Sequence, residues 1–355
     1  MTNIDFRQRW PAPETPKPIV IIGAGGIVRD AHLPAYRKAG FPVRGLFDLD
    51  HDRAEALAGD WEVGRSYATL REAVEDNGTD AVYDLATPSD AITGILPELP
   101  EGAAVLIQKP MGSDLAQARS IRSICRERSL KAAVNFQLRF SPMMMAVQNA
   151  IRQGRLGDLL DIEVHLNIFT PWHMFPFLKA MDRVEISVHS IHYLDLYRAI
   201  AGNPLGVFTR TLADPRAPEF AQTRTSVLLD YPPPLRGLMT INHNHRGGRK
   251  HQSAMFRFEG TDGAMMVKLG LLYDYPNGEE DEVWICPNDG EWERIPLVGA
   301  WFPDAFIGTM SNVQRFDAGA DEELVSSVDD AFQTMALVEA CFEANSAAGV
   351  PIAAD

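Results

Sequence analysis

The stretch from Pro18 to Asp50 constrains the fold of this chain more than any other. A short apolar run, Ile19–Ile22, ends abruptly at Gly23-Ala24-Gly25-Gly26, and an amphipathic segment follows. A second apolar run, Val43–Phe47, is followed at once by Asp48. Strand, glycine turn, helix, strand and acid is the order that a dinucleotide-binding βαβ unit requires.

Each part of this motif has a physical reason. Gly23 permits a tight turn off the strand, and Gly25 leaves room for a pyrophosphate to approach the backbone. The helix that begins near Gly26 and Ile27 offers unpaired N–H groups and a partial positive charge to phosphates. Asp48 can accept hydrogen bonds from ribose hydroxyls and would repel a 2′-phosphate, so the motif favours NAD over NADP.

Length and composition narrow the class of protein. A chain of 355 residues with 46% apolar residues suggests about two domains, and no run is apolar and long enough to cross a membrane. The net charge of −15 argues against nucleic acid and anionic membranes as partners. Residues 1-16 are predicted to be a loosely ordered tail without a signal segment, so a cytoplasmic location is expected. Three scattered cysteines indicate reduced thiols rather than disulfides.

Predicted strands and helices alternate from residue 17 to residue 138. The predicted strands are 19–22, 43–47, 80–86, 103–108 and 131–137, and the predicted helices include 50–58, 67–77, 89–99 and 113–128. This alternation predicts an α/β fold with a doubly wound parallel sheet, a Rossmann domain over 17-138. Such sheets bind ligands at the carboxyl ends of their strands, where Gly23, Asp48, Thr87 and Lys109 are expected.

The pattern changes from residue 139 onward. We predict helices over 143–153, 183–201 and 322–347, and strands over 159–169, 207–212, 223–230, 237–245, 254–259, 264–269 and 282–286. Strands that follow one another without intervening helices favour a mostly antiparallel sheet. The region 139-355 is therefore predicted to be an α+β domain for substrate binding and oligomerisation.

Lys109 is the first candidate catalytic residue. It ends a predicted parallel strand and is followed by Pro110. Its ammonium would lie beside the nicotinamide, where it could polarise a substrate oxygen, and burial would lower its pKa toward the range of proton transfer. The alternative is a surface lysine after an edge strand.

His189 and His192 are the second candidates. Three positions apart on a predicted helix, they share a face, and an imidazole exchanges protons near neutral pH. One alternative is a core histidine next to a capping histidine. Another is zinc, with His243 or His245 from one face of a predicted strand as the third ligand. No carboxylate or cysteine at a motif spacing completes that set, so no metal is expected.

Two further clusters are candidates for substrate contacts. Trp172, His173 and Phe175 follow a predicted strand and could line a sugar face, although aromatic residues there are as often core or interface. The basic segment Arg246–His251 could bind an anionic group of the substrate or a neighbouring subunit. A solvated loop is an equal alternative for this segment.

Motifs along most of the chain after the tail match those of one known family. They are the Gly23 turn with Ala31–Ala35, Asp48, Asp80–Val82 with Ala86–Pro88, Lys109-Pro110, Asn135 with Arg139-Phe140, Gly154 with Leu156-Gly157, His192 with Asp195, Phe258–Thr261 with Gly263, and Val338–Ala340. In these features the sequence resembles the glucose-fructose oxidoreductase/inositol dehydrogenase/MocA family.

The resemblance implies a Rossmann domain and an α/β domain whose open sheet often forms the interface of a homodimer or homotetramer. It implies NAD(P)-dependent oxidation of a secondary alcohol on a sugar, cyclitol or related polyol. Lys109 would contact the reacting hydroxyl, and His192 would exchange its proton. Thr87 and Pro88 would line the nicotinamide ribose. Arg139, Trp172 and His173 are further candidate substrate contacts.

Two departures from the family pattern affect the site. Gln108 stands where the family usually has a glutamate. Val188 and Ser190 stand where the family has an aspartate, four residues before the histidine, and a glycine. His189, or Glu185 one turn earlier, is a hypothetical substitute. Two other functions stay open: a glycoside-cleaving enzyme that retains NAD, and a dinucleotide-sensing regulator without catalysis.

Overall fold

The structure is a computed structural model, and it describes residues 6–349 and 351–352. These residues form two compact units. Unit 1 contains the described residues up to Arg155 together with Asp281–Val283 and Arg294–Met335. Unit 2 contains Leu156–Glu280, Trp284–Glu293 and the described residues after Met335. The boundary between a dinucleotide-binding domain that ends at residue 138 and a substrate-binding domain that begins at residue 139 stays a prediction.

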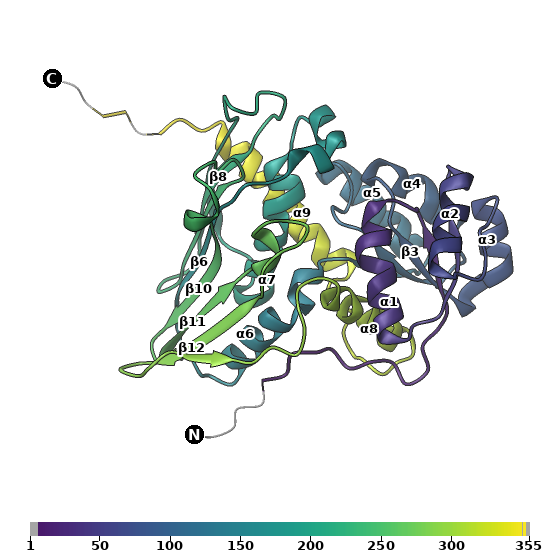
Figure 1. Cartoon of the computed structure of the whole chain (residues 1–355), viewed down its shortest axis with the longest axis horizontal. Helices are drawn as coiled ribbons and strands as arrows, with labels where there is room; N and C mark the ends of the chain where they lie inside the picture. Colours follow the sequence, from purple (N-terminus) through teal and green to yellow (C-terminus); the bar gives the residue numbers. More distant parts are fainter. Residues whose placement is uncertain (1–5, 350, 353–355) are drawn as a thin grey trace. The chain divides into compact units, whose positions relative to one another are not determined.

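Unit 1 is built on a five-stranded parallel sheet with the order β2-β1-β3-β4-β5, which confirms the predicted Rossmann topology. Its strands are β1 (Ile19–Ile22), β2 (Val43–Phe47), β3 (Val82–Leu85), β4 (Ala104–Ile107) and β5 (Lys131–Val134). The sequence order reverses at β1, and ligands of doubly wound sheets bind at such a reversal. The α1–α5 helices surround this sheet (Figure 1).

The helices of unit 1 include four that begin at a capping side chain. They are α1 (Leu33–Ala39), α2 (His51–Trp61), α3 (Leu70–Asn77), α4 (Ile92–Ile95), α5 (Leu115–Glu127), α6 (Pro142–Arg152) and α8 (Asp304–Asp317). Asp50, Thr69, Asp114 and Ser141 each accept a hydrogen bond from a backbone N–H in the first turn of the following helix. A π-helical turn, Val28–His32, precedes α1.

Residues in register end the central strands at one level. Ile22 pairs with Leu85, Leu85 with Ile107, and Ile107 with Val134. The positions that follow these four residues therefore form one edge of the sheet. Beneath the sheet, the apolar side chains of β1 and β4 share a core with Phe306 of α8.

The tail prediction is wrong for residues 6–16. The indole N–H of Trp10 donates to Asp321 at 2.7 Å, and the Trp10 ring contacts Phe140 edge to face with centroids 5.3 Å apart. The Gln8 and Arg9 side chains donate to backbone carbonyls of Pro296 and Val298. These partners are distant in sequence, so local composition carried no sign of them.

An eight-stranded, mostly antiparallel sheet forms the body of unit 2, as predicted, with the order β13-β12-β11-β10-β6-β9-β8-β7. Its strands are β6 (Leu159–Asn167), β7 (Gly206–Leu212), β8 (Arg224–Asp230), β9 (Arg236–Asn242), β10 (Ser253–Gly260), β11 (Gly263–Lys268), β12 (Glu282–Pro287) and β13 (Glu293–Ile295). β6 and β9 run parallel, whereas β7–β8, β8–β9, β6–β10 and β10–β11 are antiparallel pairs. Figure 1 shows this sheet as a broad curved layer.

One face of this sheet is buried and the other is open, because its strands alternate buried and exposed side chains. On the buried face lies α7 (Ile191–Ala201), where the Tyr197 hydroxyl reaches the carbonyl oxygens of Ile162 and Leu238 at 2.7 and 2.6 Å. Gly237 allows this approach, since a Cβ there would lie 3.2 Å from the Tyr197 ring and 3.0 Å from Leu229.

Several predicted boundaries of helices and strands are wrong. β9 ends at Asn242, so His243 and His245 follow the strand rather than share its face. The helix predicted over 183–201 begins with a π-helical turn, Ile186–Ser190, before α7. Helix α8 was not predicted, and α9 (Val328–Asn345) begins later than expected. No helix in the described part of the chain is long and apolar enough to cross a bilayer.

Candidate functional site

The glycine turn after β1 has the geometry of a phosphate-binding loop. Gly23 has φ +108°, and a Cβ there would lie 2.5 Å from the carbonyl oxygen of Ala86. No other side chain fits that position. At Gly25 an added Cβ would meet no atom within 4 Å, so the space beside the turn is open. The helical turns that begin at Gly26 and Ile27 present their first N–H groups here.

The Asp48 carboxylate is fixed beside this turn. One oxygen accepts the backbone N–H of Ala24 at 2.7 Å. The other accepts the N–H of Asp50 at 2.9 Å and the Arg53 guanidinium at 3.0 Å. The Asp48 side chain is 13% exposed, so its oxygens remain within reach of solvent at the end of β2.

Three side chains at the aligned strand ends carry buried polar atoms with no hydrogen-bond partner in the described part of the protein. They are the Thr87 hydroxyl after β3, the Gln108 amide oxygen after β4, and both amide atoms of Asn135 after β5. Asn135 has no exposed surface at all. Each unsatisfied buried group costs about 1–3 kcal/mol, so a polar molecule that meets them stabilises this edge. Together with the open space at Gly25, these residues fit a bound dinucleotide.

Lys109 follows Gln108 at the same edge of unit 1. The residue as a whole is only partly buried, yet burial of its ammonium group lowers the pKa of Lys109 from 10.5 to about 8. A lysine with this pKa is charged at neutral pH and exchanges its proton readily in mildly alkaline solution. Pro88, which follows Thr87, is exposed.

Glu185 is the centre of a buried polar cluster in unit 2. Its carboxylate accepts the Ser190 hydroxyl, which lies 2.8 and 3.0 Å from the two oxygens, and neither residue is exposed. The π-helical turn places residues five apart on one face, which explains this pairing. His243 lies beyond β9 with its Nε2 atom 3.3 Å from Glu185 and its Nδ1 atom 2.8 Å from the Thr170 hydroxyl.

The rings of His189, His243 and Trp172 meet around this cluster. The His189 and His243 ring centroids are 4.4 Å apart, and Trp172 lies 5.9 and 5.7 Å from them. Trp172 also stacks on Phe220 at 4.5 Å, and its N–H donates to Asn244 at 2.7 Å. Trp172 therefore forms part of a packed wall rather than an open platform.

The other predicted site residues lie in different surroundings. His192 is in the first turn of α7 and is 9% exposed, whereas His173 is exposed. Arg139 is 5% exposed, and its guanidinium donates to Asp330 at 2.6 Å and to the Val325 carbonyl at 3.2 Å. These contacts give Arg139 a structural anchor within unit 1. Among the described residues, no three or more His, Cys, Asp or Glu side chains lie together in a group that could hold a metal ion.

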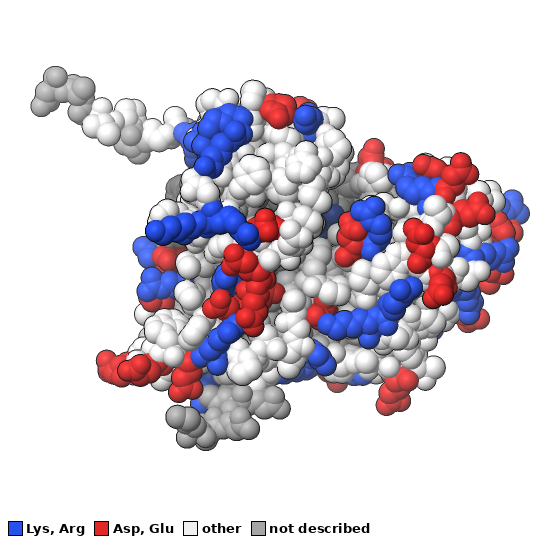
Figure 2. Space-filling view, viewed as in Figure 1, with Lys and Arg blue, Asp and Glu red and all other residues white. Residues whose placement is uncertain are grey.

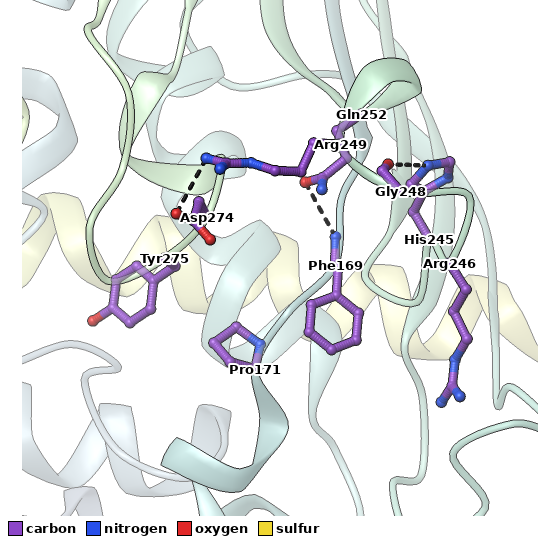
Figure 3. Close-up of a pocket in the computed structure, with 9 residues that line it drawn as sticks. All are labelled: Phe169, Pro171, His245, Arg246, Gly248, Arg249, Gln252, Asp274 and Tyr275. Atoms are coloured by element: carbon purple, nitrogen blue, oxygen red, sulfur yellow. Dashed lines mark hydrogen bonds and ion pairs between the residues drawn. The ribbon is translucent and has the colours of Figure 1, made fainter.

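An open pocket of about 350 Å³ lies at the end of the unit 2 sheet. It is lined by Phe169, Pro171, His245, Arg246, Gly248, Arg249, Gln252, Asp274 and Tyr275 (Figure 3). In this view Phe169 and Pro171 lie between Tyr275 on one side and Arg246 on the other, and Arg249 reaches across to Asp274. The basic segment predicted from the sequence therefore lines a pocket.

Acidic and basic side chains are interspersed on the face of the molecule drawn in Figure 2. Figure 2 shows Lys and Arg next to Asp and Glu over both units, and the described residues form no continuous basic surface on this face.

Sequence reasoning missed Thr170, Asn135 and the pairing of Glu185 with His243. Thr170 and His243 lie beyond their strands, so no periodicity connected them. Asn135 was part of a matching motif, and its polar character directly after an apolar strand was the available signal.

Comparisons with known proteins agree with this geometry. The glucose-fructose oxidoreductase/inositol dehydrogenase/MocA family, described as an oxidoreductase family with an NAD-binding Rossmann fold, matches residues 17–136. Inositol 2-dehydrogenase of Rhizobium meliloti is 32% identical over 332 residues, which cover 90% of this chain and 94% of the relative.

Two solved structures share the fold over nearly the whole chain. An oxidoreductase from Agrobacterium radiobacter in complex with NAD⁺, L-tartaric acid and magnesium superposes with a TM-score of 0.78 at 19% identity, covering 94% of this chain and 97% of the other. Levoglucosan dehydrogenase in complex with NADH and levoglucosan has a TM-score of 0.78 at 16% identity, with 94% and 98% covered.

Proposed function

Because this chain belongs to the glucose-fructose oxidoreductase/inositol dehydrogenase/MocA family of oxidoreductases, we propose that it is an NAD-dependent dehydrogenase of a sugar, cyclitol or related polyol. It oxidises a secondary alcohol, and the bound nicotinamide ring supplies the acceptor for the hydride that leaves the carbinol carbon. The observation that carries the proposal is the Asp48 carboxylate, fixed 2.7 Å from the N–H of Ala24 in the Gly23 turn.

NAD is the proposed coenzyme rather than NADP. The Asp48 carboxylate accepts hydrogen bonds from ribose hydroxyls and repels a 2′-phosphate. Gly23, Gly25, Gly26 and Ile27 take the pyrophosphate on backbone N–H groups. Two relatives of known structure contain NAD⁺ or NADH, which supports the choice.

Lys109 polarises the substrate oxygen in this proposal. Its ammonium donates a hydrogen bond to the hydroxyl and stabilises the negative charge that develops on the oxygen as hydride departs. Because its pKa is about 8, the Lys109 ammonium is a stronger acid than that of an ordinary lysine and donates a stronger hydrogen bond to the oxygen. Thr87, Pro88 and Gln108 border the nicotinamide ribose.

His192 serves as the acid or base that exchanges the hydroxyl proton, and His189 supports it. Glu185 replaces the aspartate that the family has at the position of Val188. Support comes from the buried contact of Glu185 with His243, whose ring lies 4.4 Å from that of His189. Thr170 and Ser190 fix the two partners of this pair.

A homodimer or homotetramer that packs on the open face of the sheet is also proposed. Phe208 of β7 and Leu228 of β8 are cross-strand partners on that face and are 66% and 37% exposed. A second copy of the chain would cover these side chains. Phe208→Glu should shift light scattering toward the monomer mass, and an unchanged mass would contradict this interface.

Two measurements test the dehydrogenase assignment. Calorimetry should show binding of NAD and weaker binding of NADP, and a screen with sugars, sugar acids and inositols should show NADH formation. NAD retained through purification with no net NADH would instead indicate the glycoside-cleaving alternative. Binding of NAD without turnover of any substrate would indicate a regulator, and absence of binding would contradict the whole assignment.

A further inference from the structure

The pocket of unit 2 lies in a basic part of an acidic chain. The whole sequence has 48 acidic and 33 basic residues, yet none of the residues between Asp230 and Glu259 is acidic. The same interval contains Arg236, Arg246, Arg249, Lys250 and Arg257. Arg246 and Arg249 line the pocket, so the local charge there opposes the charge of the protein as a whole.

The two arginines differ in their partners. The Arg249 guanidinium lies 3.1 Å from the Asp274 carboxylate and 3.9 Å from Glu279, so its charge is largely compensated. The Arg246 guanidinium donates to the backbone carbonyl of Arg216 at 3.0 Å, and no ion pair to it occurs among the described residues. Arg246 therefore keeps an uncompensated charge and further donors at the pocket.

The remaining lining gives the pocket a rigid shape and an apolar side. Phe169 is 48% exposed in the pocket, beside Pro171, and the Tyr275 ring is held 5.9 Å from that of Phe175. Both ring nitrogens of His245 have partners, with Nε2 3.1 Å from the Gly248 carbonyl and Nδ1 3.0 Å from the Asn167 amide. His245 thus fixes the loop that presents Arg246.

We propose that this pocket binds the anionic group of the substrate, a carboxylate or a phosphate, on Arg246. The carbon skeleton of the substrate then lies against Phe169 and Tyr275, and Gln252 and Asp274 offer hydrogen bonds to its hydroxyls. This proposal rests on the proposed dehydrogenase function and narrows its substrate class to acidic sugars and polyols. A guanidinium binds both carboxylate and phosphate oxygens through paired N–H donors, so the two sources share one recognition chemistry.

The test compares neutral and acidic members of matched pairs on the full-length protein saturated with NAD. The probes are glucose, gluconate and glucose 6-phosphate, and myo-inositol with its monophosphate, with affinities from calorimetry and KM from NADH formation. We expect an acidic member to bind at least about tenfold more tightly than its neutral partner, since charged hydrogen bonds are strong. The acidic member that binds more tightly shows whether the pocket recognises a carboxylate or a phosphate.

Arg246→Gln should abolish this preference and leave the affinities for NAD and for the neutral member unchanged. Lys250→Gln is the matched control, because Lys250 is a neighbouring exposed cation that does not line the pocket. Equal affinity for neutral and acidic members would overturn the proposal, and so would an equal loss of the preference in the Lys250 variant. In either case, NADH formation with neutral polyols would leave the dehydrogenase assignment intact. A chain that binds no NAD would instead remove the proposed function itself.

Discussion

The Asp48 carboxylate at the end of β2 accepts the backbone N–H of Ala24 in the turn after β1, at 2.7 Å. The acid and the glycine turn are therefore one rigid element and not two independent motifs. The second oxygen of the same carboxylate accepts a hydrogen bond from the Arg53 guanidinium at 3.0 Å, so a cation lies beside this acid.

Asp48→Ser should raise the ratio of kcat/KM for NADP over NAD by about tenfold or more, because repulsion disappears and Arg53 is released to bind the 2′-phosphate. Initial rates with each coenzyme measure this ratio. Asp50→Ser is the control, since serine keeps the cap of α2 and Asp50 lies farther from Arg53, at 3.6 Å. A ratio that responds equally to both changes would speak against Asp48 as the discriminating residue.

The pH dependence of turnover should reflect Lys109. Its pKa in the folded protein lies near 8 rather than 10.5, so the ammonium form prevails below pH 8 and is lost as the pH rises through that value. Because the ammonium is the proposed donor, kcat should fall on the alkaline side of about pH 8. Lys109→Arg keeps the positive charge, so the fall in kcat should move to higher pH, at a lower maximal rate. A pH profile of kcat that is flat from pH 7 to about pH 10 in the unchanged protein would exclude Lys109 as the proton donor.

His189→Ala should lower kcat by roughly a hundredfold or more while NAD affinity stays unchanged, because a general acid or base and its support contribute factors of this size. Stopped-flow rates of NADH formation and calorimetric titration with NAD give the two numbers. Ser190→Ala is the comparison, since it removes one hydrogen bond to Glu185 and leaves the His189 ring in place. Normal turnover in the His189 variant would discard its supporting role.

A buried triad in unit 1 should contribute strongly to the free energy of unfolding of that unit. One oxygen of Asp84 lies 2.6 Å from both His32 and the Tyr36 hydroxyl, and all three side chains are fully buried. Burial, together with the charge of Asp84, raises the pKa of Tyr36. Asp84→Ala leaves two buried donors without a partner, so the free energy of unfolding should fall by about 3–5 kcal/mol.

Urea unfolding of the full chain measures this change. Asp84→Asn keeps an acceptor oxygen and should cost less, and Asp60→Ala, an exposed change on α2, should stay within about 0.5 kcal/mol of the unchanged protein. Similar losses for Asp84→Ala and Asp60→Ala would contradict a special role for the triad.

The sequence predicted the parallel sheet of unit 1 well because its information is local. Apolar runs such as Ile19–Ile22 mark fully buried strands, and a glycine with positive φ at position 23 has few alternatives. The same logic placed Thr87 and Lys109 at one edge, since strands in register end together. The Asp48–Ala24 bond itself joins residues that only the fold brings together.

The errors arise where distant segments decide the outcome. The structural contact of Arg139 could not be predicted, because its partner Asp330 is 191 positions away, and its contact with substrate stays a prediction. Trp10 appeared to belong to a loose tail, yet Asp321 holds its indole. His243 was predicted to lie on a strand, whereas β9 ends at Asn242 and the His243 ring lies 3.3 Å from Glu185, which is 58 positions away.

The wide helical turn over Ile186–Ser190 affects how this chain is compared with its relatives. Counting four places back from His192 arrives at Val188, inside that turn, where offsets learned from ordinary helices no longer give the direction of a side chain. Position number alone therefore does not show which side chain of this segment lies beside His192, whereas the carboxylate of Glu185 lies 3.3 Å from the ring of His243. In a chain with such a turn, the equivalent of a family carboxylate is better sought by the position of its oxygens in space than by its residue number.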